Sequence, residues 1–311
     1  MAWRALGVAL VLGVTAAAPA AVPIREARWL APGADRVAVL TTELPECLVM
    51  PADAVAARAV EIGRAAFSSP HLLGGQAARA GLSCAACHAN GHGNSDFVFP
   101  GLSGAPGTAD VTSFLVSPRR GNDSFQPRPI PSLYDPPRLA DRNPALPALR
   151  DFIRGLIVEE FDGPEPADAV LDGLAAYVRA LDPGCRAKPR QPVLLAVRIA
   201  DVDRAARSAM LLLADGDTAS AQALLLAARD RLGRIAERFP GTRLAEAHAV
   251  VRAQDAQLAA IAARAAADPA GARAALDRWL AALPVELRPV TAAAGASLFA
   301  PDQVRILVEA R

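Results

Sequence analysis

Apolar residues recur at helical spacing in three stretches of the first two-thirds of the chain. These stretches are 51–67, 148–161 and 165–184. In the first stretch, Gly63 lies between Val60 and Phe67 on the apolar face, where the lack of a side chain lets another helix approach closely. The pattern predicts three amphipathic helices whose apolar faces pack into a core, with a long irregular segment between the first helix and the other two.

A second set of helical patterns follows a Pro-containing linker at 189–192. We expect helices near 193–214, 218–239, 243–267 and 270–283, with a short helix at the end. Start and stop residues support these limits, namely Gly216, Pro240-Gly241 and Asp268-Pro269. The succession of helices and short turns is similar to that of tetratricopeptide-like hairpins, but the Trp, Gly and Tyr positions of that repeat are missing. The sequence therefore predicts a mainly α protein with an α-helical bundle or helical-hairpin domain at 193–311.

The first residues have the pattern of an export signal. Arg4 supplies a positive charge, residues 6–14 form an apolar stretch too short to span a bilayer, and Ala18-Pro19-Ala20 resembles a cleavage site. We interpret residues 1–20 as a secretory signal peptide, with a retained N-terminal anchor as the alternative. Either interpretation places the body of the protein outside the cytoplasm, in the periplasm, and leaves 21–46 as an N-terminal segment.

Charge and hydropathy narrow the possible partners. The 311 residues include 33 Lys and Arg against 32 Asp and Glu, and Lys188 is the single lysine. This balance argues against nucleic acid or an anionic lipid surface as the main partner. After the first residues, no apolar run approaches the ~20 residues that a membrane helix needs, so we expect no transmembrane span once the signal is removed.

Cys84, Cys87 and His88 form the Cys-x-x-Cys-His pattern of c-type haem attachment. Two intervening residues place the thiols about one helical turn apart, where both can form thioethers with the vinyl groups of one haem. The adjacent His88 then binds the iron as proximal ligand. A thioredoxin-like pair would need a βαβ setting, and a zinc site would need a second ligand pair, and the sequence supplies neither. We expect one covalent haem c.

The order of elements around this motif resembles that of class I cytochromes c, whose first and last helices cross. A closer resemblance covers residues 55–182 and is to the first haem domain of bacterial di-haem cytochrome c peroxidases and methylamine-utilisation (MauG-like) enzymes. It is carried by "EIGRAAFSSPHLLGGQAARAGLSCAACH", by "RPIPSLYD" at 128–135 and by "ADRNPALPALRDFI". The resemblance implies a cytochrome c-like haem domain at 47–186 and an oxidoreductase function.

The chain departs from that family in several respects. It has one Cys-x-x-Cys-His motif where the family has two, and Leu139-Ala140-Asp141 stands where the family often has Trp-Asp-Gly. The Gln, Pro and Glu cluster over the family's peroxidatic iron is not recognisable, although Glu159-Glu160 lies in the general region. The resemblance therefore transfers Cys84, Cys87 and His88 to this chain and leaves catalytic residues unknown.

The two remaining cysteines, Cys47 and Cys185, lie before the first and after the last helix of this haem domain. Because those helices cross in class I cytochromes, and because export leads to an oxidising compartment, we expect a disulfide between them. Two separate thiols are the alternative, since sequence does not fix connectivity.

The second axial ligand of the iron is not evident. From Gly93 to Ala209 the chain contains neither Met nor His, which are the usual ligands in an electron-transfer cytochrome. Candidates elsewhere are Met50, His71, His92, Met210 and His248, with Tyr134, Lys188 or a backbone group as less common ligands. We expect His92 to be solvated or to meet a haem propionate, and the iron to be five-coordinate or weakly capped.

The expected function is that of an exported mono-haem c-type cytochrome that transfers electrons to or from a partner redox protein. One alternative is a peroxidase-type enzyme that uses an open distal haem site. Another is a haem-based sensor whose helical C-terminal domain is the output or binds a protein.

Overall fold

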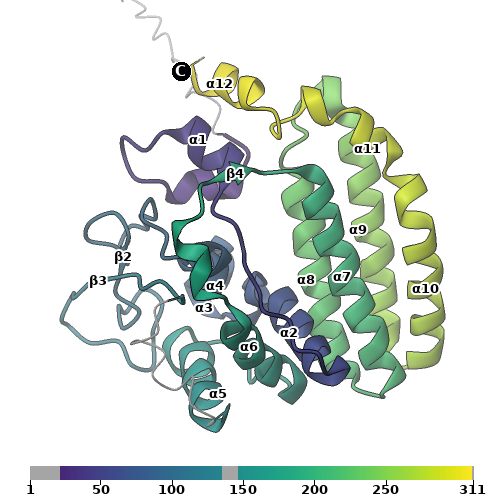
Figure 1. Ribbon diagram of the computed structural model, residues 1–311, viewed down its shortest axis with the longest axis horizontal. Coiled ribbons are helices and arrows are strands. Elements are labelled where there is room, and N and C mark those ends of the chain that lie inside the picture. The colour runs from purple at the N-terminus through teal and green to yellow at the C-terminus, as the bar shows by residue number, and fades with distance from the viewer. Residues whose placement is uncertain (1–21, 135–145, 310–311) are drawn as a thin grey trace, which may run out of the picture.

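The protein is described here by a computed structural model, which covers residues 22–134 and 146–309. It is mainly helical, as the hydrophobic pattern predicts, and four long helices of the second half stand side by side along one edge (Figure 1). The segments 1–20 and Leu139-Ala140-Asp141, to which the sequence analysis assigns a signal peptide and a family position, lie outside the described residues.

Two crossing helices form the centre of the first half. They are α2 (Ala54–Phe67), which Asp53 caps by accepting from the Ala56 amide at 2.8 Å, and α6 (Asp168–Ala180). Gly63 of α2 touches the backbone of Gly173, where a Cβ added to Gly63 would lie 1.8 Å from the carbonyl oxygen of Gly173. The close approach expected at Gly63 is therefore confirmed, and its partner is the last helix of this half.

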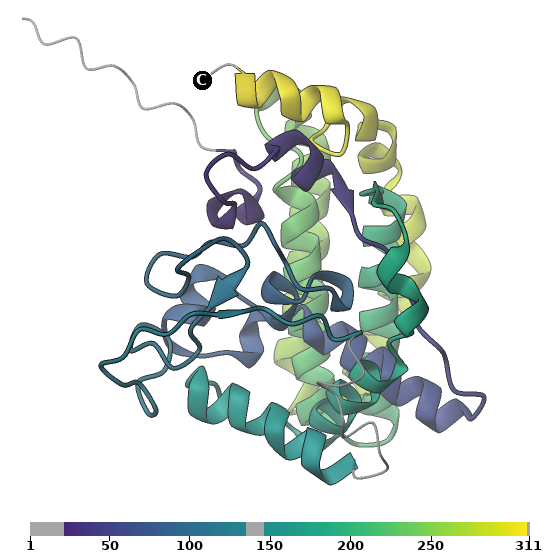
Figure 2. The same cartoon turned by 60° about the vertical axis from the view of Figure 1, so that its left-hand side comes forward.

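Short elements and loops connect α2 to α6 along the chain. They are α3 (Gly75–Ala80), α4 (Cys84–Cys87), β2 (Thr108–Ala109), β3 (Arg128–Pro129) and α5 (Leu146–Gly155). Strands β2 and β3 pair antiparallel in a loop-rich layer that projects from the helices (Figure 2). The single helix expected over 148–161 is instead α5 followed by a π-helical turn, Leu156–Glu160.

The second half is a bundle of α7 (Leu195–Ala214), α8 (Thr218–Ala236), α9 (Ala245–Ala265) and α10 (Pro269–Glu286). These limits agree with the expected ones within three residues. Helix α10 continues through Pro284 and ends three residues after the expected limit of 283, because the amide of Leu287 still bonds to the carbonyl of Leu283 and both side chains are buried. Two short helices, α11 (Arg288–Ala292) and α12 (Pro301–Glu309), follow. Across residues 22–134 and 146–309, we find no helix with the length and apolarity that crossing a membrane requires.

The N-terminal segment, for which the sequence predicted no elements, joins both halves. It contains a 3₁₀ turn (Arg25–Trp29), α1 (Arg36–Thr41) and β1 (Thr42–Glu43), and β1 pairs antiparallel with β4 (Gln191–Pro192). Its buried apolar side chains form a small core with the C-terminal residues Leu298 and Val304. Helix α1 accordingly lies beside α12 (Figure 1).

Arginines of α8 fasten the bundle to the end of α2. Arg231 donates to the carbonyls of Ala65 and Arg64 at 2.9 and 3.1 Å, and Arg234 donates to Ser68 at 3.3 Å. These carbonyls belong to the C-terminal end of α2, where carbonyls lack intrahelical partners and the helix dipole is negative. We refer to this contact as the α2–α8 joint, and it packs the two halves around one continuous core.

We predict that Gly63→Ala lowers the free energy of unfolding by about 3 kcal/mol, because the added methyl meets backbone that cannot move aside. Gly155→Ala is the matched control, since no atom lies within 4 Å of its added Cβ, and it should be neutral or stabilise by up to about 1 kcal/mol. Chemical denaturation of both variants measures the difference. Equal stabilities would contradict the close backbone contact of α2 with α6.

Candidate functional site

The two thiols of the motif lie on a single helical turn. Gly81 ends α3 in the left-handed conformation at φ 76°, and the chain then turns at Leu82, whose side chain is buried and whose amide bonds to Ala77. Helix α4 follows at once and carries the partly buried Cys84 and Cys87, both of them free thiols. This local fold presents both sulfur atoms from one short, anchored turn.

Burial raises the pKa of the Cys84 thiol to about 11 and that of the Cys87 thiol to about 12. Both therefore stay protonated at neutral pH, unlike the low-pKa thiolates of disulfide oxidoreductases. This difference argues against the redox-pair alternative.

His88 is oriented by a backbone carbonyl. Its Nδ1 lies 3.0 Å from the carbonyl oxygen of Pro131, which accepts only, so Nδ1 carries the proton and Nε2 keeps its lone pair. Burial lowers the pKa of the imidazole to about 4, so the ring is neutral at physiological pH. A neutral imidazole whose other nitrogen donates to a carbonyl is the usual arrangement of a metal-ligating histidine.

A cavity of about 370 Å³ opens beside Cys87 and His88. It is lined further by both strands of the β2–β3 ribbon and by the loops next to them: Ala109, Asp110, Val111, Thr112, Asn122, Ser124, Gln126, Arg128, Pro129, Ile130 and Pro131. Its volume is in the range of small-molecule sites. The sequence analysis singled out the segment 128–135 only through its family resemblance and did not identify Asp110.

Asp110 fixes the loop that forms this cavity. Its carboxylate accepts from the amide and hydroxyl of Thr112 at 3.0 and 2.7 Å, and from the amide of Gln126 at 2.8 Å. Burial opposes ionisation of Asp110, but these hydrogen bonds outweigh it and hold the pKa below its ordinary value. The ionised side chain thereby joins two ends of the loop, a role that no local pattern in the sequence reveals.

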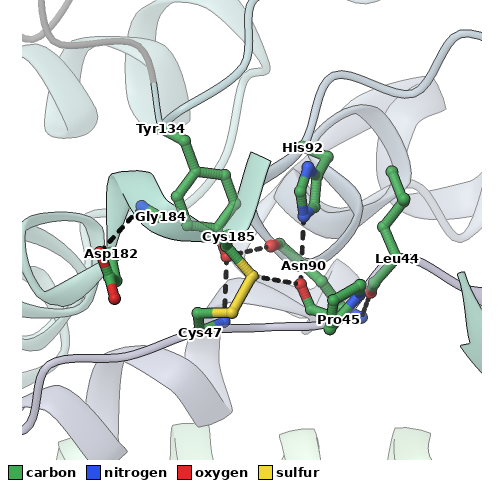
Figure 3. Close-up of a disulfide and its surroundings, with 9 residues drawn as sticks. All are labelled: Leu44, Pro45, Cys47, Asn90, His92, Tyr134, Asp182, Gly184 and Cys185. Carbon is green, nitrogen blue, oxygen red and sulfur yellow. Dashed lines mark hydrogen bonds between the residues drawn. A yellow bond between two sulfur atoms is a disulfide. The ribbon is translucent and has the colours of Figure 1, made fainter. Parts of the chain in front are cut away.

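The expected disulfide between Cys47 and Cys185 is present, with 5.6 Å between the Cα atoms (Figure 3). It packs against the turn that follows His88. The Tyr134 hydroxyl donates to the carbonyl of Asn90 at 2.9 Å and accepts from the Cys47 amide at 3.2 Å. The disulfide and Tyr134 therefore hold the chain just after His88.

Of the two expectations for His92, solvation is wrong, and contact with a haem propionate stays a prediction. His92 is buried rather than solvated, with Nε2 3.1 Å from the carbonyl of Pro45 and its ring 4.6 Å from that of Tyr134 (Figure 3). It does not line the cavity beside His88. Its neighbours are Pro45 of the N-terminal segment, Tyr134 and the disulfide (Figure 3).

The other candidate axial ligands lie apart from this cavity. Met50, His71, Lys188 and His248 are exposed, and Met210 packs within the bundle on α7. Tyr134 is fully buried and its hydroxyl is already hydrogen-bonded. Within the described part of the chain, none of these side chains lines the cavity beside His88.

Glu160 occupies the π-helical turn and is buried. It accepts from Ser117 at 3.2 Å and from Arg120 at 2.9 Å, and Arg120 also contacts Glu159 at 2.5 Å. Neither glutamate lines the cavity beside His88. Glu159 and Glu160 instead bind Ser117 and Arg120, and thereby fasten the loop between β2 and β3, which we call the cavity loop, to the turn that follows α5.

Comparison of the chain with protein-family models, with curated proteins and with solved structures gave no match.

We predict that Asp110→Asn lowers the free energy of unfolding by about 2 kcal/mol at pH 7, because the amide replaces a charged acceptor of three hydrogen bonds. The folded-state pKa of Asp110 lies below the unfolded value of about 4, so its stabilisation is complete above that pH and is lost as the pH falls through the folded value. Wild type and variant should therefore converge in acid. Urea unfolding at pH 7 and at an acidic pH below the folded-state pKa measures this difference, with the exposed Asp123→Asn as control. A pH-independent difference would contradict the assignment.

Proposed function

We propose that this chain is an exported c-type cytochrome that holds one haem through Cys84 and Cys87, with His88 as proximal iron ligand, and transfers electrons with a partner redox protein. The observation that carries the proposal is the state of His88. Its ring is neutral, and Pro131 holds Nδ1 so that Nε2 is available as a ligand next to two protonated thiols on one helical turn.

The residues around the motif fit a haem. The two thiols are spaced for thioether bonds, and the cavity beside Cys87 and His88 carries one arginine, Arg128, that would pair with a propionate. Asp110 keeps the loop that bears Arg128 in place. When bound, haem iron supplies a one-electron couple whose potential depends on its axial ligands and on burial.

The helix arrangement supports a cytochrome c-like fold for 47–186. Helices α2 and α6 cross at Gly63 and Gly173, and α4 follows α2 in the position of a haem-attachment turn. We propose on this basis, together with the sequence resemblance, a relationship to the first domain of the di-haem peroxidase and MauG-like enzymes.

A periplasmic location is supported by the Cys47–Cys185 disulfide as well as by the N-terminal pattern. Disulfides form and persist in oxidising compartments. Cys84 and Cys87, in contrast, are free thiols although they lie one turn apart, which leaves them available for thioether formation.

We predict that the exported protein retains one haem after denaturation, and that Cys84→Ala combined with Cys87→Ala abolishes this covalent retention. Intact-mass spectrometry and a pyridine haemochrome spectrum measure it. Cys47→Ala with Cys185→Ala is the matched control, because it also removes two sulfurs, and it should keep the haem. Covalent haem in the first variant would disprove the attachment site.

One observation favours ligand chemistry as a second candidate function. The chain brings no Met or His other than His88 to the cavity lining among the described residues. An open iron position would suit a peroxidase-type enzyme, in which hydrogen peroxide takes up two electrons from a partner redox protein and two protons to give two waters. A sensor that binds a gas would use the same opening.

We predict high-spin ferric iron and rapid carbon monoxide binding by the ferrous protein. Met50→Leu and Met210→Leu should leave both spectra unchanged, because Met50 is exposed and Met210 packs in the bundle. A low-spin ferric spectrum with a methionine–iron charge-transfer band that either variant removes would instead establish a six-coordinate electron carrier.

A further inference from the structure

A second cavity of about 370 Å³ lies on the side of α4 opposite to Cys87 and His88, where Ala85, Ala86 and Ala89 form part of its wall. The N-terminal segment, α2, α6, α7 and α8 all contribute to it. We call it the central cavity. It borders the α2–α8 joint, so a molecule in it would contact the N-terminal segment and both halves of the protein.

The central cavity is rich in arginine. Six arginines line it against five carboxylates. They are Arg64, Arg190, Arg198, Arg231, Arg234 and Arg238, with Glu26, Glu43, Glu46, Asp96 and Asp201. No pattern in the sequence gathers these residues, which come from six separate segments of the chain.

Three of the arginines have carboxylate partners. Arg64 pairs with Glu46, and Arg198 pairs with Glu43. Arg234 pairs with Glu26 at 2.8 Å and with Asp230 at 2.8 Å. These pairs account for most of the negative charge in the lining.

The other three arginines bond to neutral oxygens. Arg231 donates to the α2 carbonyls of the joint, and Arg238 donates to the carbonyls of Leu298 and Leu40 at 2.8 and 3.0 Å. Arg190 donates to the hydroxyl and carbonyl of Thr42. None of the three forms an ion pair with a described residue.

Each of these guanidinium groups keeps donors beyond the two that are used. A guanidinium has five N–H donors. Burial lowers the pKa of Arg231 and of Arg238 to about 10, and the nearby carboxylates, Asp201 for Arg231 and Glu26 for Arg238, offset this cost only in part. An anion in the cavity would offset that cost.

Part of the remaining wall is aromatic. Trp29, Phe67 and Tyr177 line the cavity, and the ring of Phe299 lies 4.8 Å from the guanidinium carbon of Arg238. A ligand that fits such a wall carries an apolar body as well as a charged group.

We propose that the central cavity binds a small organic anion, whose carboxylate or phosphate group is held by Arg238 and Arg190 and whose apolar body packs on the aromatic wall. The site is separate from the haem site and does not depend on the proposed function. Its ligand would contact the N-terminal segment, α2 and the bundle at once, and would stabilise their packing by mass action.

Isothermal titration calorimetry on the full exported protein at low ionic strength tests this proposal, with phenyl phosphate and inorganic phosphate as probes. Phenyl phosphate should bind, and about tenfold more tightly than inorganic phosphate, because burial of the ring adds to the charge interaction. Binding should weaken with added sodium chloride. No binding of either probe up to about 10 mM, or equal affinity for both, would overturn the proposal.

Two variants locate the site. Arg238→Gln should weaken phenyl phosphate binding by about tenfold or more, since a charged donor is lost. Arg190→Gln is the second variant, because this residue is exposed and its loss leaves the core intact should Arg238→Gln fail to fold. Arg305→Gln is the matched control on α12, where the arginine is half-exposed and pairs with Asp302. Unchanged affinity in Arg190→Gln, or an equal loss in Arg305→Gln, would overturn the assignment.

Discussion

The backbone contact between α2 and α6 is the constraint on which the first half of the protein depends. Because Gly63 and Gly173 carry no side chains, the two helices approach to backbone distance. That crossing brings Cys47, which precedes α2, next to Cys185, which follows α6, and the disulfide closes the pair. The same packing leaves α4 on one side of the crossing, with its thiols toward the β2–β3 ribbon.

The packing of the helical bundle against the first half depends on the C-terminal end of α2. Its last carbonyls need donors, and Arg231 and Arg234 of α8 supply them. The cost of burying these guanidinium groups is offset in part by Asp230 and Glu26, which pair with Arg234. Charge therefore joins the halves and gives the joint a defined register, while the apolar side chains of α2, α7 and α8 give it most of its area.

The sequence predicted the regular elements well and the site only in part. The limits of α7 to α10 followed from apolar periodicity and from Gly, Asp and Pro at the ends, which are local signals. The disulfide followed from the resemblance to crossing helices. By contrast, Asp110, Pro131 and the arginines of the central cavity act through partners distant in the chain, so no local pattern reveals them. Solvation of His92 was wrongly expected, because its ring packs against Tyr134 and its Nε2 contacts the carbonyl of Pro45.

The restraints around His88 are uneven, and this asymmetry bears on the two candidate functions. On one side, the disulfide, Tyr134 and the carbonyl of Pro131 fix the ring and the turn after it. On the other side, Arg119 pairs with Asp162 and Arg120 pairs with Glu160, and these arginines are 58% and 55% exposed. An exposed ion pair such as that of Arg119 contributes at most about 1 kcal/mol, so the buried Glu160, which also accepts from Ser117, is the stronger restraint on this loop. For the haem protein proposed above, a fixed His88 suits both candidate functions, whereas a cavity to which no described Met or His other than His88 contributes suits the entry of a ligand more than fast electron exchange.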